Sequence, residues 1–144
     1  MQMNQAFHSS LIRFEFFIPF QFADPAGIVF YGNVFSITHY AFEQFIIHQL
    51  HIPWTEWFQN EVWITPIKHT EATYSKPLFA GKTCQTLISH LTLSQSSFSI
   101  LYQIEQEGVC ATVKTVHVFC DSSTKEKIQI PASIRSKLLQ FSSD

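Results

Sequence analysis

One carboxylate in a turn-forming segment is the strongest candidate for chemistry in this sequence. Residues 24–33 read DPAGIVFYGN, so Asp24 opens an Asp-Pro-x-Gly turn shortly before a predicted helix. Asp, Pro and Gly each occupy a position that they favour in a type I turn, so a plain turn explains these residues without any chemistry. The segment also places a carboxylate close to the backbone amides of a helix N-terminus. Such amides and the helix dipole stabilise an oxyanion, so together the two features could support acyl transfer.

Asp24 could act on an acyl group in two ways. A carboxylate can attack the acyl carbon and form an acyl-enzyme anhydride, or it can accept a proton from an attacking water. The sequence leaves both roles open. Each backbone amide that binds the oxyanion typically contributes about 3–4 kcal/mol to lowering the barrier.

Three polar residues share one narrow face of the predicted helix. At about 100° per residue, Ser36, His39 and Glu43 fall together, and the rest of the circumference is apolar. His39 and Glu43 have the i, i+4 spacing at which side chains can hydrogen-bond. One interpretation is an ordinary solvated face. In the other, His39 or Glu43 orients water or touches the acyl group of a substrate.

Other catalytic patterns are missing from the sequence. No G-x-S-x-G segment supports a serine hydrolase. His48 and His51 stand three residues apart without an H-E-x-x-H pattern, so no metal site is expected. The 4 glycines form no phosphate-binding loop, and no cofactor is expected.

Asp24 lies between a predicted strand and a predicted helix. Apolar and polar residues alternate over residues 11–20, as in a half-buried strand. Residues 33–50 form a helix with Asn33 as its capping residue, and its broad apolar arc predicts that other structure wraps around it. The remaining elements are strands over residues 62–74, 83–93, 97–106 and 109–120, and a short helix that has Pro131 at its first position. This order predicts an α+β fold, an antiparallel sheet curling around one long helix.

Length and composition favour one self-associating domain. The chain has 144 residues, enough for a single domain over 1–144, with about the first ten as a loose lead-in. Apolar residues make up 46% and charged residues only 14%, against a usual charged share of about 25%. Such a surplus suggests that contact between subunits covers some apolar surface.

Charge and cysteine content narrow the partners and the compartment. A net charge of −2 gives no reason to expect nucleic acid binding. No apolar run is long enough for a membrane span, and the first residues lack the basic start and apolar centre of a signal peptide. The 3 cysteines contain no C-x-x-C pair. We therefore expect free thiols in the core and a cytoplasmic protein.

Residues 24–33 closely resemble the signature of the 4-hydroxybenzoyl-CoA thioesterase family, commonly D-x-A-G-[IV]-V-[YF]-[YH]-x-N. Residues 72–77 (ATYSKP) are similar to the family's Y-x-x-P turn and residues 130–134 (IPASI) to its L-P-x-x-[IV] ending, so the resemblance covers nearly the whole chain. It implies a hotdog fold, with an antiparallel sheet wrapped around a long central helix, and hydrolysis of acyl-CoA thioesters. It also implies homodimers that join two sheets edge to edge, often paired into homotetramers, with active sites at the dimer interface.

The resemblance also implies roles for individual residues. Asp24 matches the catalytic aspartate, and Tyr31 matches the residue whose backbone amide points at the thioester carbonyl. Gly32 and Asn33 fall where the helix begins, beside the substrate. Lys76 lies in a turn where relatives often carry basic residues and is the expected contact for the phosphates of coenzyme A. Three other lysines could contribute, namely Lys68, Lys82 and Lys114.

Two departures from the family pattern bear on the choice of substrate. Phe22 stands where many relatives carry a second acid, and His39 stands where the family often has an acid or another polar group. The 15 phenylalanines favour a medium-length, aromatic or otherwise apolar acyl group. The rivals are a thioesterase acting on acyl carrier protein and a non-catalytic acyl-binding or scaffolding protein. A hotdog hydratase is disfavoured, because it would need a histidine closely after the aspartate and this chain has Tyr31 where some relatives have histidine. Asp24 favours the thioesterase.

Overall fold

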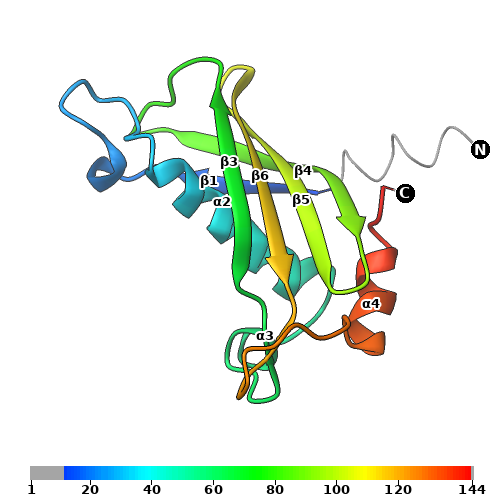
Figure 1. The fold of residues 1–144 in the computed structure, drawn as a ribbon. Coiled ribbons are helices and arrows are strands. Elements are labelled where there is room, and N and C mark those ends of the chain that lie inside the picture. The colour runs from blue at the N-terminus through cyan, green and yellow to red at the C-terminus, as the bar shows by residue number, and fades with distance from the viewer. Residues whose placement is uncertain (1–11, 144) are drawn as a thin grey trace, which may run out of the picture.

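A five-stranded antiparallel sheet forms the larger part of the protein (Figure 1). The computed structural model describes residues 12–143, so the lead-in predicted for the first ten residues lies outside the described residues. Every neighbouring pair of strands is antiparallel. In their order across the sheet, the strands are β1 (Arg13–Phe17), β4 (Thr83–Leu93), β5 (Ser97–Glu105), β6 (Val109–Val118) and β3 (Ile67–Tyr74).

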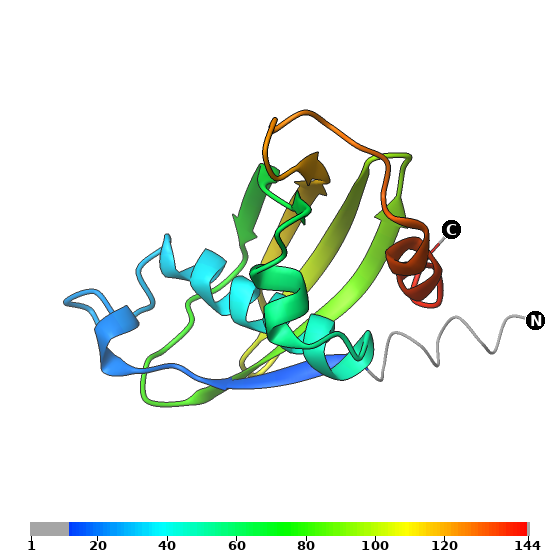
Figure 2. The ribbon, with the colours of Figure 1, turned by 90° about the horizontal axis from the view of Figure 1, so that it is seen from below.

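One long helix lies against the concave face of this sheet (Figure 2). Helix α2 spans Asn33–Gln44 and continues without a break into a π-helical segment, η2 (Phe45–Gln49). Most of its apolar side chains are buried, Ile37, Phe45 and Ile46 completely. The predicted α+β arrangement, a sheet curling around one helix, is therefore confirmed.

The start of α2 differs from the prediction. Gly32, not Asn33, is the capping residue, and no side chain caps the helix. The Asn33 side chain instead donates a hydrogen bond to the carbonyl oxygen of Phe22, 3.0 Å away. Phe22 belongs to the short helix η1 (Phe20–Phe22), so this bond ties the helix start to the loop that carries Asp24.

The strand predicted over residues 62–74 is interrupted. Its first part is β2 (Trp63–Ile64), which pairs with β7 (Cys120–Asp121) in a separate two-stranded sheet. Pro66 follows β2, and a proline has no N–H group to continue a ladder. The long strand β3 begins only after it. Helix α3 (Trp54–Phe58) and helix α4 (Ala132–Leu139) complete the fold, and Pro131 caps α4 rather than occupying its first position.

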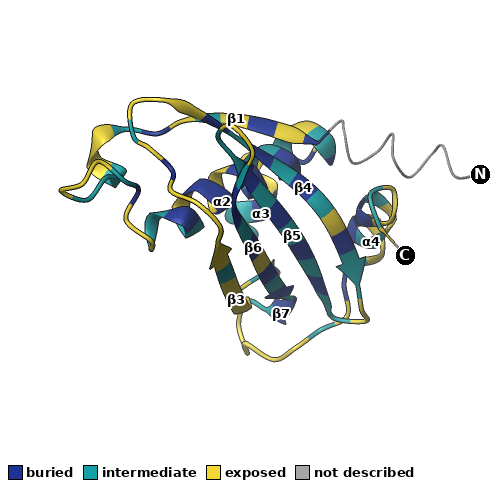
Figure 3. Cartoon of the chain, turned by 90° about the horizontal axis from the view of Figure 1, so that it is seen from above, coloured by how far each residue is buried: buried dark blue, intermediate teal, exposed yellow. Residues whose placement is uncertain are grey.

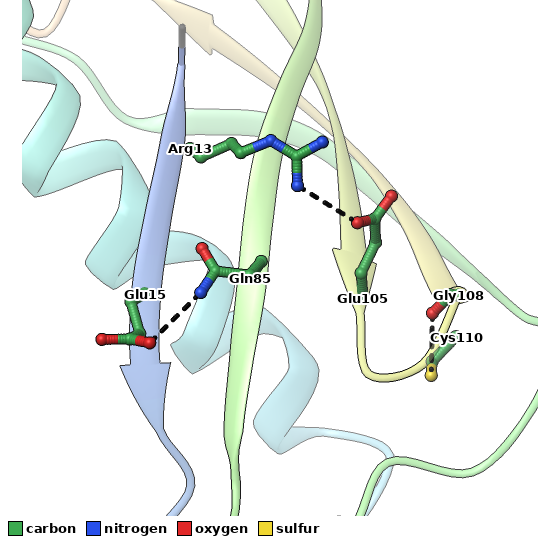
Figure 4. A network of polar contacts seen from close by, with 6 residues as sticks. All are labelled: Arg13, Glu15, Gln85, Glu105, Gly108 and Cys110. Atoms are coloured by element: carbon green, nitrogen blue, oxygen red, sulfur yellow. Dashed lines mark hydrogen bonds and ion pairs between the residues drawn. The ribbon is translucent and has the colours of Figure 1, made fainter. Parts of the chain in front are cut away.

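Side chains on the outer face of the sheet link β1, β4 and β5 (Figure 4). Arg13 and Glu105 form an ion pair at 3.4 Å, and Gln85 donates a hydrogen bond of 3.3 Å to Glu15. Such exposed contacts contribute about 0–1 kcal/mol each, so they support the strand register more than the stability. Cys84, Cys110 and Cys120 are buried and form no disulfide. The predicted free core thiols are confirmed, and burial raises the pKa of Cys84 to about 12.

The β3 edge of the sheet is open to solvent. Every residue of β3 is exposed except Ala72, which is partly buried, whereas β5 and β6 alternate between buried and less buried residues (Figure 3). β3 is also the last strand of the sheet, so its outer edge has no neighbouring strand within residues 12–143. Over the same residues, no helix has the length and apolar character needed to cross a membrane.

Candidate active site

Asp24 sits in a tight turn that its own side chain stabilises. The carboxylate oxygen Oδ1 accepts hydrogen bonds from the backbone amides of Ala26 at 2.8 Å and Ile28 at 3.2 Å. Gly27 closes the turn at a φ of +79°, a conformation that glycine adopts without strain. Within residues 12–143 no group donates a hydrogen bond to the other oxygen, Oδ2. The turn therefore fixes the half-buried carboxylate and leaves one oxygen for a substrate or a water.

Two backbone amides at the start of α2 lack a partner. The N–H groups of Asn33, Val34 and Phe35 already donate to the carbonyl oxygens of residues 30, 31 and 32. The N–H groups of Tyr31 and Gly32 donate to no other atom of residues 12–143. These two amides, positioned at a helix N-terminus, are suited to bind a negatively charged oxygen.

A cleft of about 520 Å³ joins the carboxylate to this helix start. Asp24, Tyr31 and Lys76 all line it, so three of the predicted site residues come together. The carbonyl oxygen of Tyr31 accepts a hydrogen bond of 2.7 Å from the hydroxyl of Tyr74 at the end of β3. Burial and the nearby Tyr31 phenol raise the pKa of Tyr74, which keeps this donor protonated. The role of Tyr74 was missed from sequence, although it is the tyrosine of the Y-x-x-P segment.

Tyr74→Phe tests this bond. The Tyr31 carbonyl and the Gly32 amide belong to one peptide group, so a hydrogen bond to the carbonyl orients and polarises the N–H on its other side. Losing a bond worth about 1 kcal/mol should lower kcat/KM for thioester hydrolysis about fivefold, measured by thiol release. Tyr40→Phe is the matched control, since Tyr40 is similarly exposed on α2 and its hydroxyl makes no hydrogen bond within residues 12–143. Equal rates for the two variants would contradict the role of Tyr74.

Lys76 lines both the Asp24 cleft and a neighbouring groove. Its ammonium group donates to the carbonyl oxygen of Glu107 in the β5–β6 turn, and it also lines a second groove of about 440 Å³. Lys82 lines that groove with its ammonium 5.7 Å from the ring centre of Phe79. Two lysines near the Asp24 cleft could bind phosphates. Lys68 and Lys114 line neither the cleft nor the groove.

His39 and Glu43 lie away from Asp24. Both are on α2, but His39 lines a different, smaller cavity between the helix and the sheet. The Glu43 carboxylate accepts a hydrogen bond from the indole N–H of Trp54, and no hydrogen bond joins Glu43 to His39. The hydrogen bond that their spacing suggested is therefore not formed. In the described part of the chain, no three His, Cys, Asp or Glu side chains are grouped to hold a metal ion.

Comparison with known proteins identifies the class as hotdog-fold thioester hydrolases. The chain belongs to the thioesterase-like superfamily, whose profile matches residues 18–138. It is 31% identical over 113 residues to the 1,4-dihydroxy-2-naphthoyl-CoA hydrolase of Microcystis aeruginosa, covering 78% of this chain and 81% of the relative. The enzyme of the same name from Synechococcus elongatus is 28% identical over 134 residues, covering 92% and 97%.

Solved structures agree on the fold. The 1,4-dihydroxy-2-naphthoyl-CoA thioesterase of Synechocystis aligns with a TM-score of 0.79 at 18% identity, covering 88% of this chain and 94% of that one. A gentisyl-coenzyme A thioesterase aligns with a TM-score of 0.76 at 25% identity, covering 85% and 98%. The predicted hotdog fold and thioester hydrolase class are confirmed. The 4-hydroxybenzoyl-CoA thioesterase family itself is narrower than the superfamily that these matches establish.

Proposed function

We propose that this protein hydrolyses the thioester of a hydroxylated aromatic acyl-CoA, as a close functional relative of the 4-hydroxybenzoyl-CoA thioesterases. The observation that carries this proposal is one cleft lined by both Asp24, whose Oδ2 has no hydrogen bond, and Tyr31, whose backbone amide has no partner. The acyl class comes from the relatives, whose names specify dihydroxynaphthoyl and gentisyl thioesters. A hydroxylated aromatic acyl group is a narrower class than the apolar or aromatic acyl group expected from the sequence.

The reaction adds water across the thioester. Asp24 either attacks the carbonyl carbon or removes a proton from the attacking water, and the carbonyl oxygen becomes an oxyanion held by the amides of Tyr31 and Gly32. As the oxyanion collapses, the C–S bond breaks and the sulfur leaves as a thiolate. If Asp24 acted as the base, its carboxyl group returns the proton to the thiolate. If Asp24 attacked, water then hydrolyses the acyl–Asp24 anhydride, which regenerates the carboxylate, and a proton from this water neutralises the thiolate. The products are a carboxylic acid and coenzyme A, whose phosphates Lys76 contacts. No cofactor is needed.

We propose that two copies pair along the open edge of β3. An unpaired strand edge readily pairs with another strand. Four large side chains on β3 or in contact with its end are between 47% and 66% exposed, namely Phe30, Tyr31, Ile67 and Tyr74. Pairing would cover them and account for the apolar surplus of the sequence. Sedimentation equilibrium should give a mass at least twice the 16.6 kDa of one chain, and a 16.6 kDa species would contradict pairing.

A thiol-release assay over a panel of acyl thioesters tests the function. We expect kcat/KM for 1,4-dihydroxy-2-naphthoyl-CoA to exceed that for a straight-chain octanoyl-CoA at least about tenfold, since a hydrogen-bonding site discriminates strongly between such groups. Higher activity on acyl carrier protein thioesters would favour the carrier-protein enzyme. Binding of every acyl-CoA without thiol release would favour a scaffold.

A further inference from the structure

A second, smaller cavity lies between helix α2 and the sheet. Its volume is about 50 Å³, and we call it the helix–sheet recess. Thr38, His39 and Phe42 of α2 line one side, and Tyr102 of β5 with Thr115 and His117 of β6 line the other. The recess has room for a few heavy atoms, not for a whole aromatic ring.

Three residues that line this recess each carry a buried polar atom without a hydrogen-bond partner. These atoms are the hydroxyl of Tyr102, the hydroxyl of Thr115 and Nε2 of His117, whose side chains are at least nine-tenths buried. Burial raises the pKa of Tyr102, and the nearby Thr115 hydroxyl offsets part of this rise. Even so, neither hydroxyl forms a hydrogen bond of normal geometry. A buried polar group without a partner destabilises the folded protein, because it has lost its hydrogen bonds to water without gaining others. Three on residues that line one cavity therefore indicate a site for a polar ligand group.

The geometry of His117 defines what that ligand group must supply. Its ring stacks against both Phe42 and Phe98, with ring centres 4.5 Å and 4.9 Å away, and the centres of these two phenyl rings are 6.2 Å apart. Nδ1 lies 3.4 Å from the carbonyl oxygen of Thr65, which can only accept, so we place the proton of the neutral ring on Nδ1. Nε2 is then an unpartnered acceptor on a residue that lines the recess, together with two residues whose hydroxyls can donate or accept. A ligand hydroxyl satisfies this set, whereas a methyl group does not.

Strand β3 extends from the recess at its start to the Asp24 cleft at its end. The Ile67 and Thr70 side chains, near the start of β3, line the recess, while Tyr74 at its end lines the Asp24 cleft. If two copies pair antiparallel along β3, the start of one strand lies opposite the end of the other. The recess of one copy would then adjoin the Asp24 cleft of the second copy.

We propose that the helix–sheet recess binds a ring hydroxyl of the acyl group, with Tyr102, Thr115 and His117 as the residues that determine specificity. This inference rests on the proposed function and on β3 pairing. The acyl ring would lie across the interface, with its thioester at Asp24 of one copy and its hydroxylated edge in the recess of the other. Thioesters of unsubstituted aromatic acids would leave the three polar atoms unpaired and react more slowly.

The test compares 1,4-dihydroxy-2-naphthoyl-CoA with 2-naphthoyl-CoA, which lacks both hydroxyls. Tyr102→Phe and Thr115→Val each remove one hydroxyl with little change of shape. We expect each to lower kcat/KM about tenfold for the hydroxylated substrate and less than about twofold for the unsubstituted one. Thr86→Val is the matched control, because the Thr86 hydroxyl is equally buried and unpartnered but does not line the recess. It should affect neither substrate.

Equal losses on both substrates, or the same discrimination in Thr86→Val, would overturn the proposal and leave the thioesterase function standing. If the wild type releases no thiol, the proposed function fails and the recess is tested by binding. Calorimetry with 1,4-dihydroxy-2-naphthoate and 2-naphthoate should then show about tenfold weaker binding of the hydroxylated acid alone in Tyr102→Phe. Identical affinities in wild type and variant would exclude the recess as a hydroxyl site.

Discussion

Asp24→Asn is expected to lower kcat for thioester hydrolysis by about a thousandfold or more. An amide side chain is a poor nucleophile and a poor base, so either role of Asp24 is lost. A positioned general base typically contributes about 10²–10⁴ to the rate, and a covalent nucleophile often more. The backbone amides of Tyr31 and Gly32 and the binding cleft remain, so some activity above the uncatalysed rate should persist.

The asparagine variant should fold normally because it preserves the turn. The amides of Ala26 and Ile28 donate to Oδ1 of Asp24, and asparagine offers an acceptor oxygen at the same place. We expect the free energy of unfolding, measured with urea, to change by less than about 1 kcal/mol. Asp24→Ala is a poorer test, since it leaves both amides without their acceptor and perturbs the loop together with the chemistry.

Asp121 provides a matched control for this experiment. Its carboxylate closes a similar turn, accepting hydrogen bonds of 2.8 Å from the backbone amides of Ser123 and Thr124. These bonds lower the pKa of Asp121, and the turn lies next to β7, outside the Asp24 cleft. Asp121→Asn should keep the wild-type kcat. If Asp24→Asn does so too, the carboxylate has no part in the reaction.

The Asp24 cleft could be foreseen because its main parts are contiguous in sequence. Asp24 and Tyr31 belong to one ten-residue segment, in which local turn geometry and a helix start determine their relation. Tyr74 is 43 residues from Tyr31 and approaches it only through the fold, so spacing could not reveal their hydrogen bond. The capping prediction for Asn33 was wrong for a related reason, since the carbonyl of Phe22 offers its side chain a tertiary partner.

The recess shows a sharper limit of sequence patterns. The strand predicted over residues 97–106 is confirmed as β5, and Tyr102 is one of its buried residues. Alternation in this segment could not show which inward residue of β6 would lie opposite, because that depends on the register set by the turn at Glu107 and Gly108. The register pairs Phe98 with His117, which puts a histidine into an aromatic core. Whether Nε2 of His117 has a hydrogen-bond partner there depends on how helix α2 packs against the sheet, and a local sequence pattern does not predict that packing.

Lowering the pH from about 6.5 to about 4 is expected to destabilise the protein through His117. Burial lowers the pKa of His117 from about 6.5 to about 4, although the Thr65 carbonyl opposes this and the nearby His39 reinforces it. The unfolded chain therefore takes up a proton first, and over this window it binds more protons than the native state. The free energy of unfolding then falls as the pH falls, by up to about 3 kcal/mol in total.

His117→Phe separates this effect from the other titrating groups. A phenyl ring can stack against Phe42 and Phe98 as the imidazole does, but it cannot take up a proton. The free energy of unfolding is measured with urea at half-unit intervals between pH 4.5 and 7.5. Its slope against pH should be smaller in this variant by up to about 1.4 kcal/mol per pH unit, which corresponds to one proton. His90→Gln, at an exposed position on β4, should keep the wild-type slope. A slope unchanged by His117→Phe would mean that the native state admits the proton, so that His117 is not held neutral beneath α2 as an acceptor for the substrate.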